Sequence, residues 1–420
     1  MNGETVHAER AAAVLAAIDE ARAPLLDLCA RIHGHPELKF AEYQAVRWIT
    51  DMLAAKGFVV ERNVAGLPTA FRAWKASRGW RRDGAGGGPT IVFQAEYDAL
   101  PTVGHACGHN IIAAAAVGAA LGVAAAIRDL PGRVMVMGTP GEEGGGGKIL
   151  LLEAGAYDDV DVAMYVHAQS RNAVMHGNMA LARVEVTFQG QRANPLGGNT
   201  RLGEEHKGIN ALTALLLFWN NLNALRERLP RQTLLRGRIT DGGDELELEP
   251  VPLAAGASLK VTSPRYADAQ AVLEMIRSCG RAAELATGAA VGFQEFPLYR
   301  ERLSNPTLMA LMERNLRVAG CDDLDTRAVP SPASTDSGNI SWRIPLVGAF
   351  VKVCDPGINT HSPDFAAAAG SPAGHAAALL GAKGMALTAL DVLLRPDLLS
   401  RIRQDFAVAV NAASQPDAPS

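Results

Sequence analysis

Cysteine and net charge are both scarce in this 420-residue chain, and each scarcity excludes a class of protein. The formal net charge of −4 leaves no basic surface for nucleic acid and no polybasic patch for a membrane. Met1–Glu9 is charged and lacks the apolar segment of a secretory signal. We therefore expect a cytoplasmic protein that binds neither nucleic acid nor a membrane. The cysteines lack the spacing of a disulfide framework, which favours a reducing compartment: Cys29, Cys107, Cys279, Cys321 and Cys354.

One apolar run invites interpretation as a membrane span, but it is too short. Ile111–Ile127 is dominated by alanine and glycine, so we interpret it as a buried core helix. With 48% hydrophobic and 20% charged residues, a chain of this length can bury large cores and divide into two or three domains.

Short apolar segments followed by polar residues predict buried strands. Because they alternate with helical patterns, we expect an α/β fold with a mostly parallel mixed sheet, in which ligands bind at the carboxyl ends of the strands. Three such segments lead to candidate site residues: Ile91–Ala95 before Glu96-Tyr97-Asp98, Arg133–Gly138 before Thr139–Glu143, and Val160–Val166 before His167. Nearer the N-terminus we expect helices at Ala11–Ile32 and Tyr43–Lys56, strands at Phe58–Val64 and Pro68–Trp74, and a hairpin tip at Ala76–Gly88.

The pattern of apolar and polar residues changes after about residue 180. Alternating strands and two helical segments predict an inserted α+β domain at 180–296, within a discontinuous catalytic domain at 1–179 and 297–410. Residues 411–420 are polar, and we expect a flexible tail there. The segments expected in the insert are Leu181–Phe188, Ile209–Leu229, Thr233–Thr240, Ser258–Thr262 and Tyr266–Leu285.

The most informative stretch is His105–Asn110, because it places a thiol and two imidazoles within five residues. The acidic pair Glu142-Glu143 and single histidines at 167 and 361 follow downstream. Any one of these residues is as often structural as functional. Together, cysteine sulfur, histidine nitrogen and carboxylate oxygen form a ligand set that suits a divalent transition metal. The sequence therefore predicts a metal-dependent hydrolase.

Two segments look like known motifs but lack decisive residues. Gly141–Lys148 is rich in glycine and ends in lysine, yet a phosphate-binding P-loop needs glycine at position 142 and Ser or Thr at position 149. Ser334–Asn339 resembles a nucleophile turn only loosely, because Thr335 stands where glycine is needed. We interpret the second segment as a structural loop near the site.

The ordered motifs resemble the M20 metallopeptidase family, and within it the amidohydrolase subfamily, from about residue 20 to 395. The resemblance implies a catalytic domain with an inserted lid and dimerisation domain, and hence a homodimer. It implies Glu142 as the general base and Asp98 as a residue that orients the ligands. The implied metal ligands are Cys107, His109, Glu143, His167 and His361. The motifs that carry the resemblance are Ala95–Pro101, His105–Asn110, Gly138–Gly147, His167, Ser334–Asn339 and His361.

The chemistry of the acidic pair agrees with these roles. A carboxylate beside a metal can collect a proton from the attacking water and pass it to a leaving nitrogen. The alternative is an acidic pair at a helix entry, stabilised by the helix dipole. The ligand set favours Mn²⁺ or Zn²⁺, with Ni²⁺ or Co²⁺ as alternatives, and one or two ions.

The inserted domain departs from the family pattern. Asn194 stands where the family usually has a histidine that stabilises the tetrahedral oxyanion, and Arg236 stands where relatives often have another histidine. Asn194, Arg236 or His206 could replace the missing donor in an ordinary amidase.

Two enzymatic hypotheses follow for a small-molecule substrate. The first is an amidase or dipeptidase acting on N-acyl amino acids or dipeptides. The second, slightly favoured, is an aminohydrolase that releases ammonia from an aromatic amine, as 5-nitroanthranilate aminohydrolase does. In that case Arg192, Arg201 and Arg236 are candidate partners for an anionic group. A third hypothesis, from another class, is a non-catalytic metal-binding scaffold.

Overall fold

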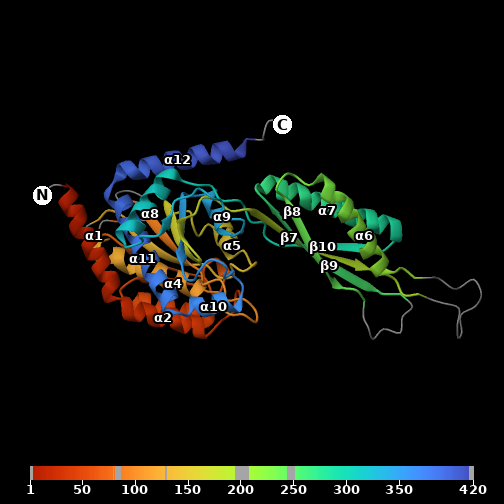
Figure 1. The fold of residues 1–420 in the computed structure, drawn as a ribbon, viewed down its shortest axis with the longest axis horizontal. Helices are drawn as coiled ribbons and strands as arrows, with labels where there is room; N and C mark the ends of the chain where they lie inside the picture. Colours follow the sequence, from red (N-terminus) through yellow and green to blue (C-terminus); the bar gives the residue numbers. More distant parts are fainter. Residues whose placement is uncertain are drawn as a thin grey trace, which may run out of the picture. The chain divides into compact units, whose positions relative to one another are not determined.

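The computed structural model describes residues 3–78, 80, 87–127, 130–193, 208–243 and 251–415. It contains two compact units (Figure 1). Unit 1 comprises Met1–Gly177, Arg302–Ser331 and Asp336–Ser420, and unit 2 comprises Asn178–Glu301 and Pro332–Thr335. The expected insert, 180–296, thus lies inside unit 2.

Unit 1 is built on an eight-stranded mixed sheet with the strand order β1-β2-β4-β3-β5-β12-β6-β11. The pairs β4–β3, β3–β5 and β5–β12 are parallel, whereas β1 and β2 are antiparallel to their neighbours. The strands are β1 Val59–Arg62, β2 Phe71–Ala76, β3 Thr90–Ala95, β4 Arg133–Gly138, β5 Val162–Gln169, β6 Asn172–Val174, β11 Leu324–Asp325 and β12 Leu346–Lys352.

Helices cover both faces of this sheet (Figure 1). The larger core includes Ile91 and Phe93 of β3, and the core of the opposite face includes Val92, because successive side chains of a strand point to opposite faces. The larger core contains residues of α1 Gly3–Glu20, α2 Arg22–Gly34, α3 Tyr43–Ala55, α4 His109–Ala126, α8 Pro306–Val318, α10 Pro363–Ala369, α11 Pro372–Leu394 and α12 Pro396–Ser414. The smaller core contains residues of η1 Val64–Gly66, α5 Gly147–Glu153 and α9 Ser337–Ser341.

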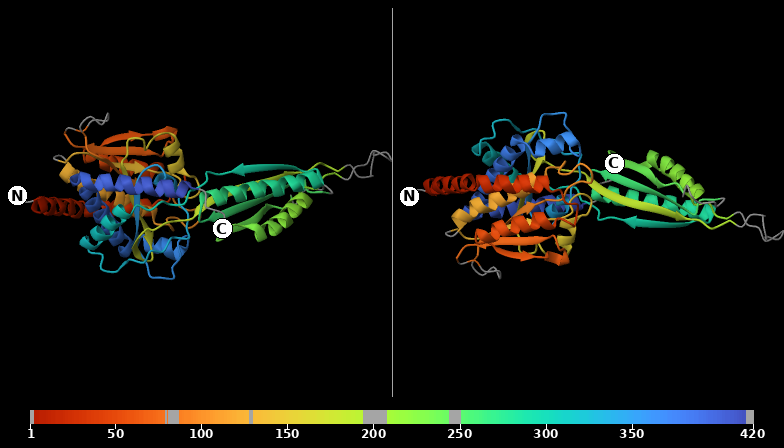
Figure 2. Two further views of the ribbon diagram at one scale, coloured as in Figure 1. Left: turned by 90° about the horizontal axis from the view of Figure 1, so that it is seen from above. Right: turned by 90° about the horizontal axis from the view of Figure 1, so that it is seen from below.

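Unit 2 is a separate α+β layer with its own core. Its antiparallel sheet has the order β10-β7-β9-β8, and two helices pack on one face of it (Figure 2). The elements are β7 Ala180–Gln189, α6 Ala211–Leu225, η3 Arg226–Arg228, β8 Leu234–Asp241, β9 Ala254–Ser263, α7 Tyr266–Thr287 and β10 Ala290–Glu295.

Two helices of unit 1 are long and apolar enough to cross a membrane by length and composition alone. They are α4 and α11, and the structure buries 89% and 83% of their most apolar windows, respectively. They pack against each other in the larger core. The expectation of a buried core helix at Ile111–Ile127 is therefore confirmed. All five cysteines are free, as their spacing predicts.

Three local expectations were wrong. The single helix expected at Ala11–Ile32 is two helices, α1 and α2, because the helical backbone breaks at Ala21, three residues before Pro24. Ala76–Gly88 does not close a hairpin, since β4 lies between β2 and β3; part of this segment lies outside the described residues. Helix α12 continues to Ser414, four residues into the expected tail.

Candidate metal centre

The acidic residues of the candidate site leave the sheet from two neighbouring parallel strands. Ala95 at the end of β3 pairs with Gly138 at the end of β4. Glu96 and Asp98 follow the first strand, and both are buried. The segment with Glu142 follows the second strand. The parallel register therefore brings both acidic segments to one edge of the sheet.

Gly108 forms the tight backbone turn that precedes His109. Its φ of +76° lies in the left-handed region, and a Cβ atom here would lie 2.4 Å from the Cβ of Ala168. Only glycine fits both conditions. Helix α4 begins at the next residue, so His109 occupies the first helical position.

Asp98 orients two of the expected ligands. Its Oδ1 lies 2.9 Å from Nδ1 of His109, and its Oδ2 accepts a 2.9 Å hydrogen bond from the backbone N–H of Glu143. A carboxylate on one imidazole nitrogen fixes the ring so that the other nitrogen can bind a metal. That other nitrogen, Nε2 of His109, is buried without a hydrogen bond.

The five expected ligands converge in two clusters that share one sulfur. Within each cluster the ligand atoms lie within 4.8 Å of one another. Nε2 of His167 lies 3.4 Å from Sγ of Cys107, while its Nδ1 bonds the backbone oxygen of Ala168. Nε2 of His361 lies 3.4 Å from Oε1 of Glu143. The clusters are Cys107, His109 and His167, and Cys107, Glu143 and His361.

The donor set fits a divalent cation. Burial, with the nearby charge of Glu143, raises the pKa of the Cys107 thiol. Burial opposes protonation of His109, but the Asp98 carboxylate and Cys107 together raise its pKa. Both groups are buried donors that a cation would stabilise in their deprotonated forms. Sulfur, imidazole and carboxylate together suit a transition metal better than magnesium or calcium.

Glu142 lies beside the two clusters and belongs to a third group of close residues, with Glu96 and His109. Its Oε2 is 3.9 Å from Nε2 of His109. Burial raises its pKa well above the usual range, and the charges of Glu96 and Glu143 raise it further. A buried carboxyl group with a raised pKa can accept and return a proton near neutral pH, which is what a general base in hydrolysis requires.

Other candidate residues belong to the insert. Asn194, Arg201 and His206 lie outside the described residues. Arg236 is an exposed residue of β8 in unit 2, where it faces Lys260 of β9 across the strand pair.

The sequence assigned no role to three buried residues near the site, Lys148, Glu96 and Asp336. Lys148 is fully buried, and its Nζ lies 2.8 Å from Oε1 of Glu96 and 2.5 Å from Oδ1 of Asp336. Glu96 stands at a strand end like the other candidates, and that position was the available signal. Lys148 begins the apolar helical run Ile149–Leu152, where a charged residue needs a buried partner.

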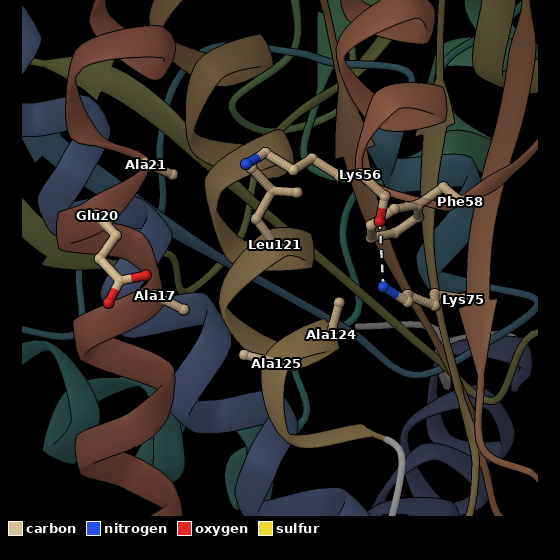
Figure 3. Close-up of a pocket in the computed structure, with 9 residues that line it drawn as sticks. All are labelled: Ala17, Glu20, Ala21, Lys56, Phe58, Lys75, Leu121, Ala124 and Ala125. Atoms are coloured by element: carbon tan, nitrogen blue, oxygen red, sulfur yellow. Dashed lines mark hydrogen bonds between the residues drawn. The ribbon is translucent and has the colours of Figure 1, made fainter.

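Three surface pockets lie elsewhere on unit 1. One, of about 210 Å³, is formed by α1, α4 and the region around β1 and β2. Figure 3 shows that Nζ of Lys75 donates a hydrogen bond to the backbone oxygen of Lys56 there. None of the nine residues that line it belongs to the two ligand clusters.

Comparison with known proteins decides the family. A model of peptidase family M20/M25/M40 matches residues 92–380, which is more than half of the chain. The chain belongs to the M20 peptidase family. It is therefore a metal-dependent hydrolase that acts on carbon–nitrogen bonds.

Relatives within the M20 family cover nearly the whole chain. The Xaa-Arg dipeptidase of Mus musculus is 35% identical over 93% of this chain and 90% of its own length. The p-aminobenzoyl-glutamate hydrolase of Escherichia coli contains a subunit that is 25% identical over 93% of both chains. Neither name confirms the aromatic amine that the sequence slightly favours as substrate.

Solved structures share the M20 fold. A putative aminohydrolase from methicillin-resistant Staphylococcus aureus has a TM-score of 0.69 at 20% identity, covering 90% of this chain and 99% of that one. A dinuclear metal-binding peptidase of the family from Bacillus subtilis has a TM-score of 0.64 at 20% identity, covering 89% and 99%. The expected α/β fold with a mostly parallel mixed sheet and a second α+β layer is confirmed.

Proposed function

We propose that this M20 hydrolase cleaves the amide bond of a dipeptide or an N-acyl amino acid. The observation that carries the proposal is the pair of ligand clusters that share Cys107, with Glu142 beside them. The 35% identity to an Xaa-Arg dipeptidase over 93% of the chain supports the choice of substrate class.

Cys107, His109 and His167 would hold one divalent cation, and Cys107, Glu143 and His361 a second. The shared sulfur supports two ions, as does the relative described as dinuclear. The bound cations supply Lewis acidity and lower the pKa of a water molecule. Mn²⁺ and Zn²⁺ are the first choices for this donor set, with Ni²⁺ and Co²⁺ as alternatives.

The side chains of this chain perform the proton transfers and set the geometry. A carboxylate oxygen of Glu142 accepts a proton from the attacking water and then delivers it to the leaving amide nitrogen. Asp98 holds the ring of His109 and the backbone of Glu143, so the two ligand clusters keep their orientation during the reaction. Cys107, His109 and Glu142 are buried, which limits their competing contacts with solvent.

A product assay separates the two enzymatic hypotheses. Purified protein is loaded with Mn²⁺, Zn²⁺, Ni²⁺ or Co²⁺ and incubated with a dipeptide panel that includes Xaa-Arg, with N-acyl amino acids, and with aromatic amines such as 5-nitroanthranilate. We expect release of free amino acids. Ammonia release from an aromatic amine, without amino acid release, would replace the proposal with the aminohydrolase. A protein that binds metal yet hydrolyses nothing would favour the scaffold.

The departure at Asn194 gives a second discriminating test. If this position supplies the oxyanion donor of an amidase, Asn194→Ala should lower kcat/KM on amides by about a hundredfold or more, while Asn194→His should preserve or raise it. In an aminohydrolase the charge of the intermediate spreads into the substrate ring. Asn194→Ala would then have a small effect, and Arg236→Ala would weaken binding of an anionic aromatic substrate.

A further inference from the structure

Two segments that fail to match a P-loop and a nucleophile turn meet in the structure. Lys148 ends the glycine-rich segment Gly141–Lys148, and Asp336 lies in the segment Ser334–Asn339. Oδ1 of Asp336 lies 2.5 Å from Nζ of Lys148, and its Oδ2 accepts a 3.0 Å hydrogen bond from the backbone N–H of the same lysine. Asp336 thus fixes both ends of Lys148.

The glycine before Lys148 makes this arrangement possible. A Cβ atom on Gly147 would lie 1.7 Å from the backbone oxygen of Pro140, so no other residue fits without moving the loop. The loop after β4 therefore passes close over its own start. Glu143 of this loop belongs to one ligand cluster and Glu142 lies beside the other, whereas Lys148 at the end of the loop is fully buried.

Lys148 connects this loop to a metal ligand through Glu96. Its Nζ lies 2.8 Å from Oε1 of Glu96, and Oε2 of the same carboxylate lies 3.4 Å from Nε2 of His109. Asp336, Lys148, Glu96 and His109 thus form a continuous buried chain, and each is at most 1% exposed. Glu96, His109 and Glu142 are also close enough together to hold a cation themselves.

We propose that Lys148 is a positioning residue that limits how Glu96 takes part in metal binding at His109. The ammonium holds Oε1, so only Oε2 faces the nitrogen that would bind the cation. Without the ammonium, both oxygens of Glu96 could turn toward the cation, as carboxylates do when they bind in a bidentate manner. The proposal rests on the metal centre of the proposed function and is independent of the substrate.

The charges around Lys148 give the direction of the effect. Glu96, Glu142 and Asp336 all act on the lysine, so its removal leaves the site more negative. A more negative site attracts a divalent cation more strongly. Loss of Lys148 should therefore tighten metal binding and change its geometry, which differs from the weaker binding that a general loss of structure would cause.

The test uses Co²⁺, whose visible spectrum reports the number and geometry of its ligands. Metal-free protein is titrated with Co²⁺ for the wild type, for Lys148→Met, and for the double variant Lys148→Met/Glu96→Gln. We expect Lys148→Met to shift the spectrum and to tighten Kd by about tenfold, a size typical of residues that orient ligands. The double variant should move both values back toward the wild type, because the freed carboxylate is gone.

The control is Lys383→Met, which removes another lysine paired with an aspartate, Asp19, at 2.7 Å. It should leave the spectrum and Kd unchanged. A folded Lys148→Met protein with the wild-type spectrum and Kd would overturn the proposal, as would a change that Glu96→Gln does not reverse.

If Lys148→Met does not fold, the single variant Glu96→Gln decides. It keeps an oxygen for Lys148 but removes the charge beside His109. A folded Glu96→Gln protein should show an altered Co²⁺ spectrum, and an unaltered one would overturn the proposal. Wild-type protein that binds no Co²⁺ would overturn the metal centre itself, whatever the variants show.

Discussion

The backbone N–H of Gly141 donates a 2.8 Å hydrogen bond to Oε1 of Glu42, a residue 99 positions earlier in the chain. The same oxygen accepts a 2.9 Å hydrogen bond from the N–H of Phe40. Glu42 thus ties the loop that carries the acidic pair to the segment before α3. Burial raises the pKa of Glu42 from 4.5 to about 7, partly offset by its hydrogen bonds.

This pKa predicts a stability change with pH. A group whose pKa is raised in the folded protein contributes stability that is fully present below pH 4.5 and is lost as the pH rises through about 7. The neutral variant Glu42→Gln lacks this loss. Between pH 4.5 and 8, the free energy of unfolding of the wild type should fall relative to that of Glu42→Gln by up to about 3 kcal/mol.

Urea unfolding at several pH values measures this difference. The matched control is Glu153→Gln, which neutralises an exposed glutamate of α5 and should leave the pH profile as in the wild type. Parallel profiles for the wild type and Glu42→Gln would show that Glu42 does not titrate in this range.

The ligand clusters predict which substitutions release the metal. His109→Ala and Glu143→Ala each remove a ligand atom and should lower the bound metal per protein, measured by elemental analysis, and abolish turnover. Cys107→Ala should have the largest effect on metal content, because the sulfur belongs to both clusters. The exposed His35→Ala serves as a control. Full metal occupancy in His109→Ala and Glu143→Ala would refute the ligand assignment.

The position of Glu142 predicts that catalysis and metal binding can be separated. Glu142→Gln retains the shape of the side chain but accepts no proton, so kcat should fall by roughly a hundredfold to ten-thousandfold. Metal content and the thermal midpoint should stay near wild-type values. Near-normal turnover in this variant would assign the base elsewhere.

Exposed apolar residues of unit 2 predict a homodimer. Leu216 on α6 is 49% exposed, and Leu234 and Ile239 on the edge strand β8 are 49% and 44% exposed. An isologous contact would cover such a surface and the unpaired edge of β8. Sedimentation at micromolar concentration should give a dimer, and Leu216→Lys with Ile239→Lys should shift it toward monomer. A fully active wild-type monomer would contradict this prediction.

The parts of the fold that follow from strand patterning were predictable. The expected strand Arg133–Gly138 is β4 residue for residue, and the acidic pair Glu142-Glu143 follows its carboxyl end. The order of the strands was not predictable, because β2 pairs with β4 across 57 to 67 residues and no local pattern in the sequence indicates that pairing. The break at Ala21 was missed because the apolar spacing continues through it.

The part of the site built from typical metal-binding residue types was predictable. Cysteine, histidine and paired glutamates narrow the possible roles, and the structure brings all five expected ligands together. The buried ion pair of Lys148 and Asp336 was not predictable, because the two residues are 188 positions apart and no local pattern connects them.

The place of β12 in the sheet has a consequence for biosynthesis. This strand lies between β5 and β6, which leave the ribosome more than 170 residues earlier, before the whole of α6 and α7. Until Leu346–Lys352 is made, β5 keeps an open edge that other strands can pair with. The nascent chain also lacks His361, so it cannot assemble both ligand clusters. Unit 1 is thus exposed to misassociation until β12 is made, and both ligand clusters can assemble only after His361 has been synthesised.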